Sequence, residues 1–140
     1  EAAGLSGLPA GANSQSLFQI AAANDDPDRP VFGEYHAAGA MTGAFMLRQG
    51  RFKLIRYQGL LSQLFDLKVD PYEETDLACE AAMTEELQRL ESVLDSFVDS
   101  GLADLSVRQS QDRLITRHGG RDVVLGDGGF TATPVPVAAD

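Results

Sequence analysis

The chain has 140 residues, 44% of them hydrophobic and 23% charged, and carries a formal net charge of −10 at pH 7. This length and composition are typical of one globular domain with a core of its own. No apolar run reaches the roughly eighteen residues of a membrane span. The acidic balance argues against nucleic acid as a partner, because phosphate binding needs clustered Lys and Arg. A single cysteine cannot form an internal disulfide, so we expect a reducing, cytoplasmic compartment.

The first half of the chain predicts a connector followed by an antiparallel sheet. Residues 1–30 are rich in Ala, Gly, Pro, Asn and Asp, which favours a connector lying against a larger body. Period-two patterns predict four strands, at 31–36, 44–48, around 52–55 and at 63–67. Turns are expected at Gln49–Gly50 and at Gly59. Mixed polarity on both faces indicates that a helix covers one face and that something outside this chain partly covers the other.

The second half predicts two helices and an extended tail. An apolar stripe at three- and four-residue steps marks the first helix and consists of Met83, Leu87, Leu90, Leu94 and Phe97. Thr84, with Glu85 and Glu86, is the expected cap of this helix, and a start one turn earlier is the alternative. A second helix is predicted over 104–118, with Leu105, Leu114 and Ile115 facing inward and Gly119 ending it. Residues 120–140 have the Gly and Pro content of an extended arm.

These elements define the expected fold class as α+β. It is a four-stranded antiparallel sheet packed against a C-terminal helix, with a second helix and an extended tail. The expected division of the chain is a connector at 1–30, an α+β subdomain at 31–119 and an extended arm at 120–140. No internal repeat is apparent in the sequence.

Residues 50–71 carry the most specific motif, GRFKLIRYQGLLSQLFDLKVDP. Two strand-like runs joined by a glycine turn and closed by Asp-Pro resemble the C-terminal region of sulfatases, of the alkaline-phosphatase-like superfamily. That region reads G-R-[FY]-K-[YL]-I, then L-[FY]-D-L-x-x-D-P-x-E. The similarity continues through Glu74 and Asp76–Ala78, and the segment VFGEYHAAGAMTGAFML resembles the E-Y-H-A segment of sulfatases related to choline sulfatase. GLPAGANSQSL upstream and RQSQDRLITRHGGRDVV downstream resemble elements of the same subgroup.

The resemblance also implies what this chain lacks. Sulfatases act through a Cys or Ser in a C/S-x-P-x-R motif, oxidised to formylglycine, beside a divalent metal such as Ca, Mn or Mg. Cys79 is followed by Glu80–Met83, without the proline and arginine of that motif, so it is not the nucleophile. Because the chain starts at Glu1 without methionine, we expect an excised C-terminal piece. Its missing partner is then an N-terminal catalytic domain, and no catalytic residue, metal ligand or cofactor is expected here.

The expected function is that of a C-terminal subdomain of a sulfatase-type hydrolase, completing the fold and one wall of a pocket for a small sulfate ester. Two alternatives remain open at this point. One is the corresponding part of a phosphonate or phosphate monoester hydrolase of the same superfamily. The other is a non-catalytic assembly module, in which the C-terminal arm joins subunits of a homo-oligomer.

His36 is the candidate pocket residue, because the matching E-Y-H-A strand end of related sulfatases lies near the mouth of the active site. Its imidazole can donate a hydrogen bond to a sulfate oxygen or to the head of a substrate. The structural alternative is a strand-end histidine bonded to a loop carbonyl. Lys53 can pair with Asp66 across the hairpin or face the missing catalytic domain, and the cross-strand pair is the expected arrangement. Asp66 and Asp70 are expected to cap turns, and Cys79 to be a buried, inert thiol.

Overall fold

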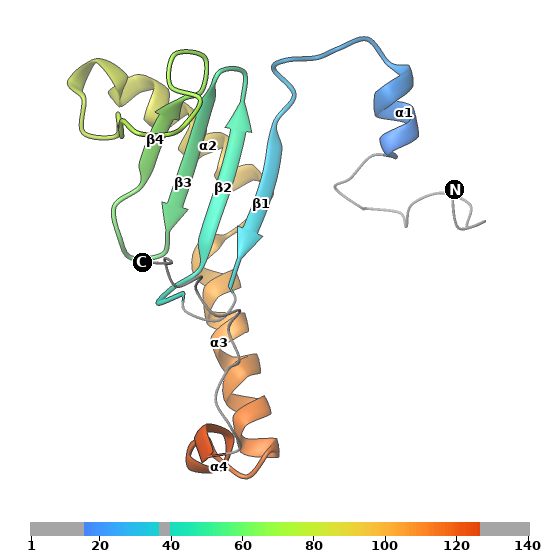
Figure 1. The fold of residues 1–140 in the computed structure, drawn as a ribbon, viewed down its shortest axis with the longest axis vertical. Coiled ribbons are helices and arrows are strands. Elements are labelled where there is room, and N and C mark those ends of the chain that lie inside the picture. The colour runs from blue at the N-terminus through green and yellow to red at the C-terminus, as the bar shows by residue number, and fades with distance from the viewer. Residues whose placement is uncertain (1–15, 37–39, 127–140) are drawn as a thin grey trace, which may run out of the picture.

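The computed structural model describes residues 16–36 and 40–126, and its centre is a four-stranded antiparallel sheet (Figure 1). The strands pair in chain order, β1-β2-β3-β4, which confirms the predicted meander. The strands are β1 (Val31–Tyr35), β2 (Ala44–Gln49), β3 (Phe52–Tyr57) and β4 (Gln63–Asp66). With the helices described below, this confirms the α+β class.

Glycines at the two hairpin turns adopt backbone angles that other residues reach only with strain. Gly50 has a φ of +59° and Gly59 a φ of +78°. Gln49 pairs with Phe52, so the first turn consists of Gly50 and Arg51. The prediction of Gln49 and Gly50 was therefore wrong by one residue, because the β-pattern of the second strand extends through Gln49.

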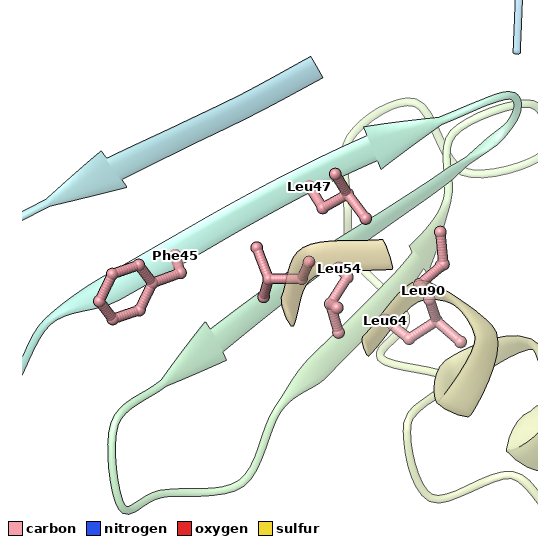
Figure 2. Packing of buried hydrophobic residues seen from close by; sticks show 6 residues of the cluster. Phe45, Leu47, Leu54, Leu64 and Leu90 are labelled. Carbon is pink, nitrogen blue, oxygen red and sulfur yellow. The ribbon is translucent and has the colours of Figure 1, made fainter. Parts of the chain in front are cut away.

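Helix α2 (Thr84–Phe97) packs against one face of the sheet and closes the core (Figure 2). A 3-10 turn, η1 (Ala81–Met83), leads into it. Burying each large apolar side chain contributes about 1.5 to 3 kcal/mol. The core consists of six side chains with no exposed surface: Phe45, Leu47, Leu54, Leu64, Leu90 and Leu94.

The start of α2 differs from the prediction. Met83 occupies the cap position, and no side-chain hydrogen bond caps the helix there. Thr84 is the first helical residue, and its hydroxyl donates to the Ala81 carbonyl at 3.0 Å. The preceding 3-10 turn thus takes the place of a side-chain cap. Glu85 and Glu86 still lie in the first turn, where negative charge is favoured by the helix dipole.

Helix α3 (Ser100–Arg117) begins four residues earlier than predicted, because Asp99 caps it. The Asp99 carboxylate accepts a hydrogen bond from the Leu102 amide at 2.9 Å. The predicted end is confirmed, since Gly119 follows with a φ of +91°. The inward orientation was wrong for Leu105 and Leu114, which are 50% and 51% exposed. The reason is that α3 extends beyond the sheet, as Figure 1 shows, and meets no second layer among the described residues.

Two six-residue helices flank this unit. Helix α1 (Leu17–Ala22) lies within the predicted connector and leaves Leu17 80% exposed. Helix α4 (Arg121–Gly126) begins where an extended arm was predicted, so that prediction is wrong for 121–126. Residues 127–140 lie outside the described part. None of the described helices combines the length and the apolar character that crossing a membrane requires.

The sheet face opposite α2 carries no helix in the described part of the chain (Figure 1). Side chains alternate along β1, so Phe32 lies towards the core while Val31 and Tyr35 lie on the opposite face. Val31 is 41% exposed and Tyr35 is 55% exposed. The prediction that something outside this chain partly covers this face stays a prediction.

Candidate functional site

His36 directly follows β1 and packs into the interior beside β2. Its side chain is only 15% exposed. The imidazole meets the ring of Phe45 edge-on, with centroids 5.3 Å apart and planes inclined by 78°. Gly43 leaves the space that the imidazole occupies: a Cβ at this position would lie 2.8 Å from His36 Cε1. The absence of a side chain at Gly43 thus permits the burial of His36.

The two ring nitrogens of His36 are buried, and neither has a hydrogen-bond partner among the described residues. The nearest carboxylate oxygen, Oε2 of Glu34, lies 3.6 Å from Nε2, which is beyond hydrogen-bond distance. Buried polar atoms are almost always bonded, and leaving one unbonded costs free energy. The loop-carbonyl bond of the structural alternative is therefore not made by any described residue.

Helix α3 contacts the backbone of the segment that joins β1 to β2. The Gly43 amide donates to Oδ1 of Asp104 at 2.7 Å. Nη2 of Arg108 donates to the Met41 carbonyl at 2.8 Å. A longer contact, 3.4 Å, joins Nε2 of Gln111 to the His36 carbonyl.

The Asp104 carboxylate accepts hydrogen bonds from both the Gly43 amide and Arg108. Nε of Arg108 donates to its Oδ2 at 2.7 Å, and this bond is the main reason that the pKa of the Asp104 carboxyl is lowered. The hydrogen bond from the Gly43 amide lowers the pKa further, and so, to a smaller degree, does the nearby His36. Burial of the carboxyl raises its pKa, but the lowering causes outweigh burial, so Asp104 is a charged acceptor for the Gly43 amide at neutral pH.

Two hollows adjoin the segment at residues 40–43. The smaller has a volume of about 40 Å³ and lies between His36, Asp104 and Arg108, which is room for water rather than for a substrate. The larger is an open depression of about 540 Å³, walled by Tyr35, Tyr57 and Leu60. Residues 40–42 line both hollows. Only the larger lies within the 300 to 1,000 Å³ that is typical of small-molecule sites.

The other residues considered in the sequence lie away from His36. Lys53 pairs with Glu73, at 2.7 Å, and not with Asp66. Because Lys53 stands opposite Phe65 in the register and Asp66 opposite Phe52, alternation places the two charges on opposite faces of the sheet. The predicted pair was wrong for this reason.

The carboxylates at the end of β4 cap turns, as predicted. Asp66, 6% exposed, accepts from Nε of Arg51 at 2.7 Å and from the Lys68 amide at 3.2 Å. Asp70 accepts from the Thr75 amide at 2.8 Å and from Glu74. These amides, Thr75 foremost, lower the pKa of Asp70.

Cys79 is exposed, so the prediction of a buried thiol was wrong. It lies in the loop before η1, where the preceding residues Leu77 and Ala78 pack against the core and Cys79 does not. In the part of the chain that the structure describes, no group of three or more His, Cys, Asp or Glu residues could hold a metal ion.

Sequence reasoning missed Asp104, Arg108 and Gln111. A signal was present, because these polar residues recur at steps of four and three along a helix and therefore share one face. Their partners are backbone groups more than sixty positions earlier in the chain. No local pattern predicts a contact of that kind.

Comparison with known proteins points to one family. No protein-family model matches the chain. Arylsulfatase K of Mus musculus is 34% identical over an alignment of 113 residues, and the match covers 73% of this chain and 20% of that protein. Arylsulfatase K of Rattus norvegicus is 38% identical over an alignment of 80 residues, and the match covers 55% of this chain and 14% of that protein. The chain thus spans a fifth or less of the curated relatives that it matches.

Among solved structures, a 2-O GAG sulfatase matches with a TM-score of 0.45 and 30% identity. The match covers 49% of this chain and 15% of that one. Sequence similarity to the curated relatives, and not this partial overlap, supports the resemblance seen in residues 50–71.

Proposed function

We propose, because the chain is related to the C-terminal region of sulfatases, that it is the C-terminal subdomain of a sulfate-ester hydrolase whose catalytic core lies outside this chain. The similarity to Arylsulfatase K over 113 residues supports the class of enzyme. The sequence supports the division of labour, since Cys79 lacks the C/S-x-P-x-R context of the family's nucleophile.

In this proposal the subdomain completes one wall of the substrate pocket, with His36 at its edge. The observation that carries this role is the buried imidazole, whose two nitrogens find no partner among the described residues. A sulfate oxygen or a polar substrate group would accept a hydrogen bond from one nitrogen. Residues 40–42, which line the small hollow beside His36, would lie beside that substrate.

The catalytic core of the parent would supply formylglycine and a divalent metal, Ca or Mn/Mg, to attack sulfur and to neutralise the sulfate oxygens. The described residues of this chain have no cluster that could hold such a metal. Their part is to bind and orient, and to limit the access of water to one side of the pocket.

The test begins with the complete reading frame that contains this chain. We expect a C/S-x-P-x-R motif upstream of Glu1. The full-length protein should hydrolyse an aryl sulfate, and replacing the Cys or Ser of that motif by Ala should abolish the activity. The 140-residue chain alone should be inactive.

Three outcomes would count against the proposal. Turnover of the aryl sulfate by the purified 140-residue chain would mean that the catalytic groups lie within it. A full-length parent that lacks the upstream C/S-x-P-x-R motif would exclude the sulfatase mechanism, because it would lack the nucleophile. A parent that cleaves a phosphate or phosphonate monoester in preference to the sulfate would favour the alternative hydrolase of the same superfamily.

A further inference from the structure

Three side chains on one face of α3 contact the backbone of the segment that follows β1. Asp104, Arg108 and Gln111 are separated by four and three residues, which places them on successive turns of the same face. Their contacts reach Gly43, Met41 and His36. The set therefore contacts this segment at His36, at the end of β1, and at Met41 and Gly43, before β2.

We propose that Asp104, Arg108 and Gln111 form a clamp that positions His36 and residues 40–43 for binding at the pocket edge. They are positioning residues, because they act through the backbone of this segment. The consequence for substrate binding rests on the proposed function, whereas the clamp itself is a property of this chain.

Asp104 is the strongest member of the clamp. Its bond to the Gly43 amide is charge-assisted, and such bonds are shorter and stronger than neutral ones. Arg108 holds the Asp104 carboxylate and the Met41 carbonyl at the same time, at 2.7 and 2.8 Å. The ion pair thus joins two backbone groups of the segment to one helix. The longer Gln111 contact adds less.

The placement of Gly43 connects the clamp to the imidazole. The Gly43 amide is bonded to Asp104, and its carbonyl accepts from the Gln58 amide at 3.0 Å. Both backbone groups are therefore fixed. The position of the missing Cβ, 2.8 Å from Cε1 and 2.9 Å from Nδ1 of His36, shows how closely this backbone bounds the ring. A shift of Gly43 must change the surroundings of the imidazole.

The experiment compares variants of the 140-residue chain by NMR. Asp104→Ala removes both the acceptor for Gly43 and the partner of Arg108. Asp104→Asn keeps an oxygen for the Gly43 amide and loses the ionic partner. Asp112→Asn is the matched control, because it makes the same charge change on the same helix, at an exposed side chain. The readouts are the imidazole nitrogen shifts of His36, their pH titration, and the hydrogen-exchange rate of the Gly43 amide.

We expect Asp104→Ala to raise the exchange rate of the Gly43 amide about tenfold or more, and to move the His36 resonances. Asp104→Asn should restore most of the Gly43 protection, and Asp112→Asn should match the wild type. An intact fold with unchanged Gly43 exchange and His36 shifts in Asp104→Ala would overturn the clamp. If Asp104→Ala does not fold, Arg108→Ala and Asp104→Asn test the clamp by the same two readouts, the exchange rate of the Gly43 amide and the His36 shifts.

Kinetics of the full-length parent separate this proposal from the previous one. If the proposed function and the clamp are both correct, Asp104→Ala lowers kcat/KM for the sulfate ester. Asp104→Asn then retains part of the lost kcat/KM, and Asp112→Asn has no effect on it. A parent without sulfatase activity refutes the proposed function and leaves the clamp to the NMR result. Normal kinetics for Asp104→Ala, beside displaced His36 resonances, refute the role of the clamp in binding.

Discussion

Helices α2 and α3 are held to the sheet in different ways. Helix α2 buries Leu90 and Leu94 completely in the core. Helix α3 is longer but has no fully buried residue, and polar side chains make its contacts with the segment between β1 and β2. Apolar burial supplies free energy without fixing direction, whereas hydrogen bonds fix geometry and contribute less net free energy. Helix α2 therefore stabilises the fold, whereas α3 fixes the geometry of backbone groups between β1 and β2.

The largest expected effect is on α2. Leu90→Ala should lower the free energy of unfolding by about 2 to 5 kcal/mol, because it leaves a cavity in a filled core. Leu105→Ala on α3 is the matched control, since Leu105 is 50% exposed, and should cost about 0.5 kcal/mol or less. Chemical denaturation measures both. Equal losses would break the contrast between the two helices.

The next effect is on the site. In the full-length parent, His36→Ala should lower kcat/KM for the sulfate ester roughly 10- to 1000-fold, about 1.4 to 4 kcal/mol of transition-state binding. Because the ring is buried against Phe45, the same variant should also lose about 1 kcal/mol of stability. His118→Ala changes the chain's other histidine, which is exposed, and should leave both measurements unchanged. Wild-type kinetics with a much lower Tm would assign His36 to structure.

A smaller effect tests whether a polar contact can also stabilise the sheet. Arg51→Met removes the guanidinium that binds both carboxylate oxygens of Asp66, a residue only 6% exposed. Leaving this carboxylate without its cation should cost about 1 to 3 kcal/mol in urea denaturation. Arg48→Met, an exposed site on β2, is the control and should cost about 0.5 kcal/mol or less. If the two variants are equally stable, the Arg51–Asp66 pair contributes nothing net.

The smallest effect is on acid stability. The pKa values of Asp70 and Asp104 lie below their ordinary value of 3.8 in the folded chain. A depressed folded pKa contributes stability above pH 3.8, and this contribution is lost as the pH falls through the lower folded value. Arg108 and His36 are the charged or titratable groups near Asp104. Asp104→Asn and Asp70→Asn should therefore each lower Tm at pH 7 and flatten its fall towards pH 2. If Tm falls equally steeply with pH in the wild type and in these variants, the prediction is contradicted.

Local patterns in the sequence determined the sheet, its order and the core face of α2. Alternation in 52–55 and 63–67, glycines at 50 and 59, and the leucine stripe of α2 act over a few residues, so they are readable without a structure. The similarity of residues 50–71 to sulfatases is likewise a property of the sequence. His36 was singled out by that resemblance and not by any local pattern.

Tertiary structure alone decided which polar groups meet. Lys53 pairs with Glu73 and Asp66 with Arg51, because the strand register puts Lys53 and Asp66 on opposite faces of the sheet. The burial of the His36 imidazole and the contact of Asp104 with Gly43, 61 positions apart, depend on how α3 approaches the end of β1. Contacts between distant segments follow from packing of whole elements, and the local periodicity of either segment does not encode them.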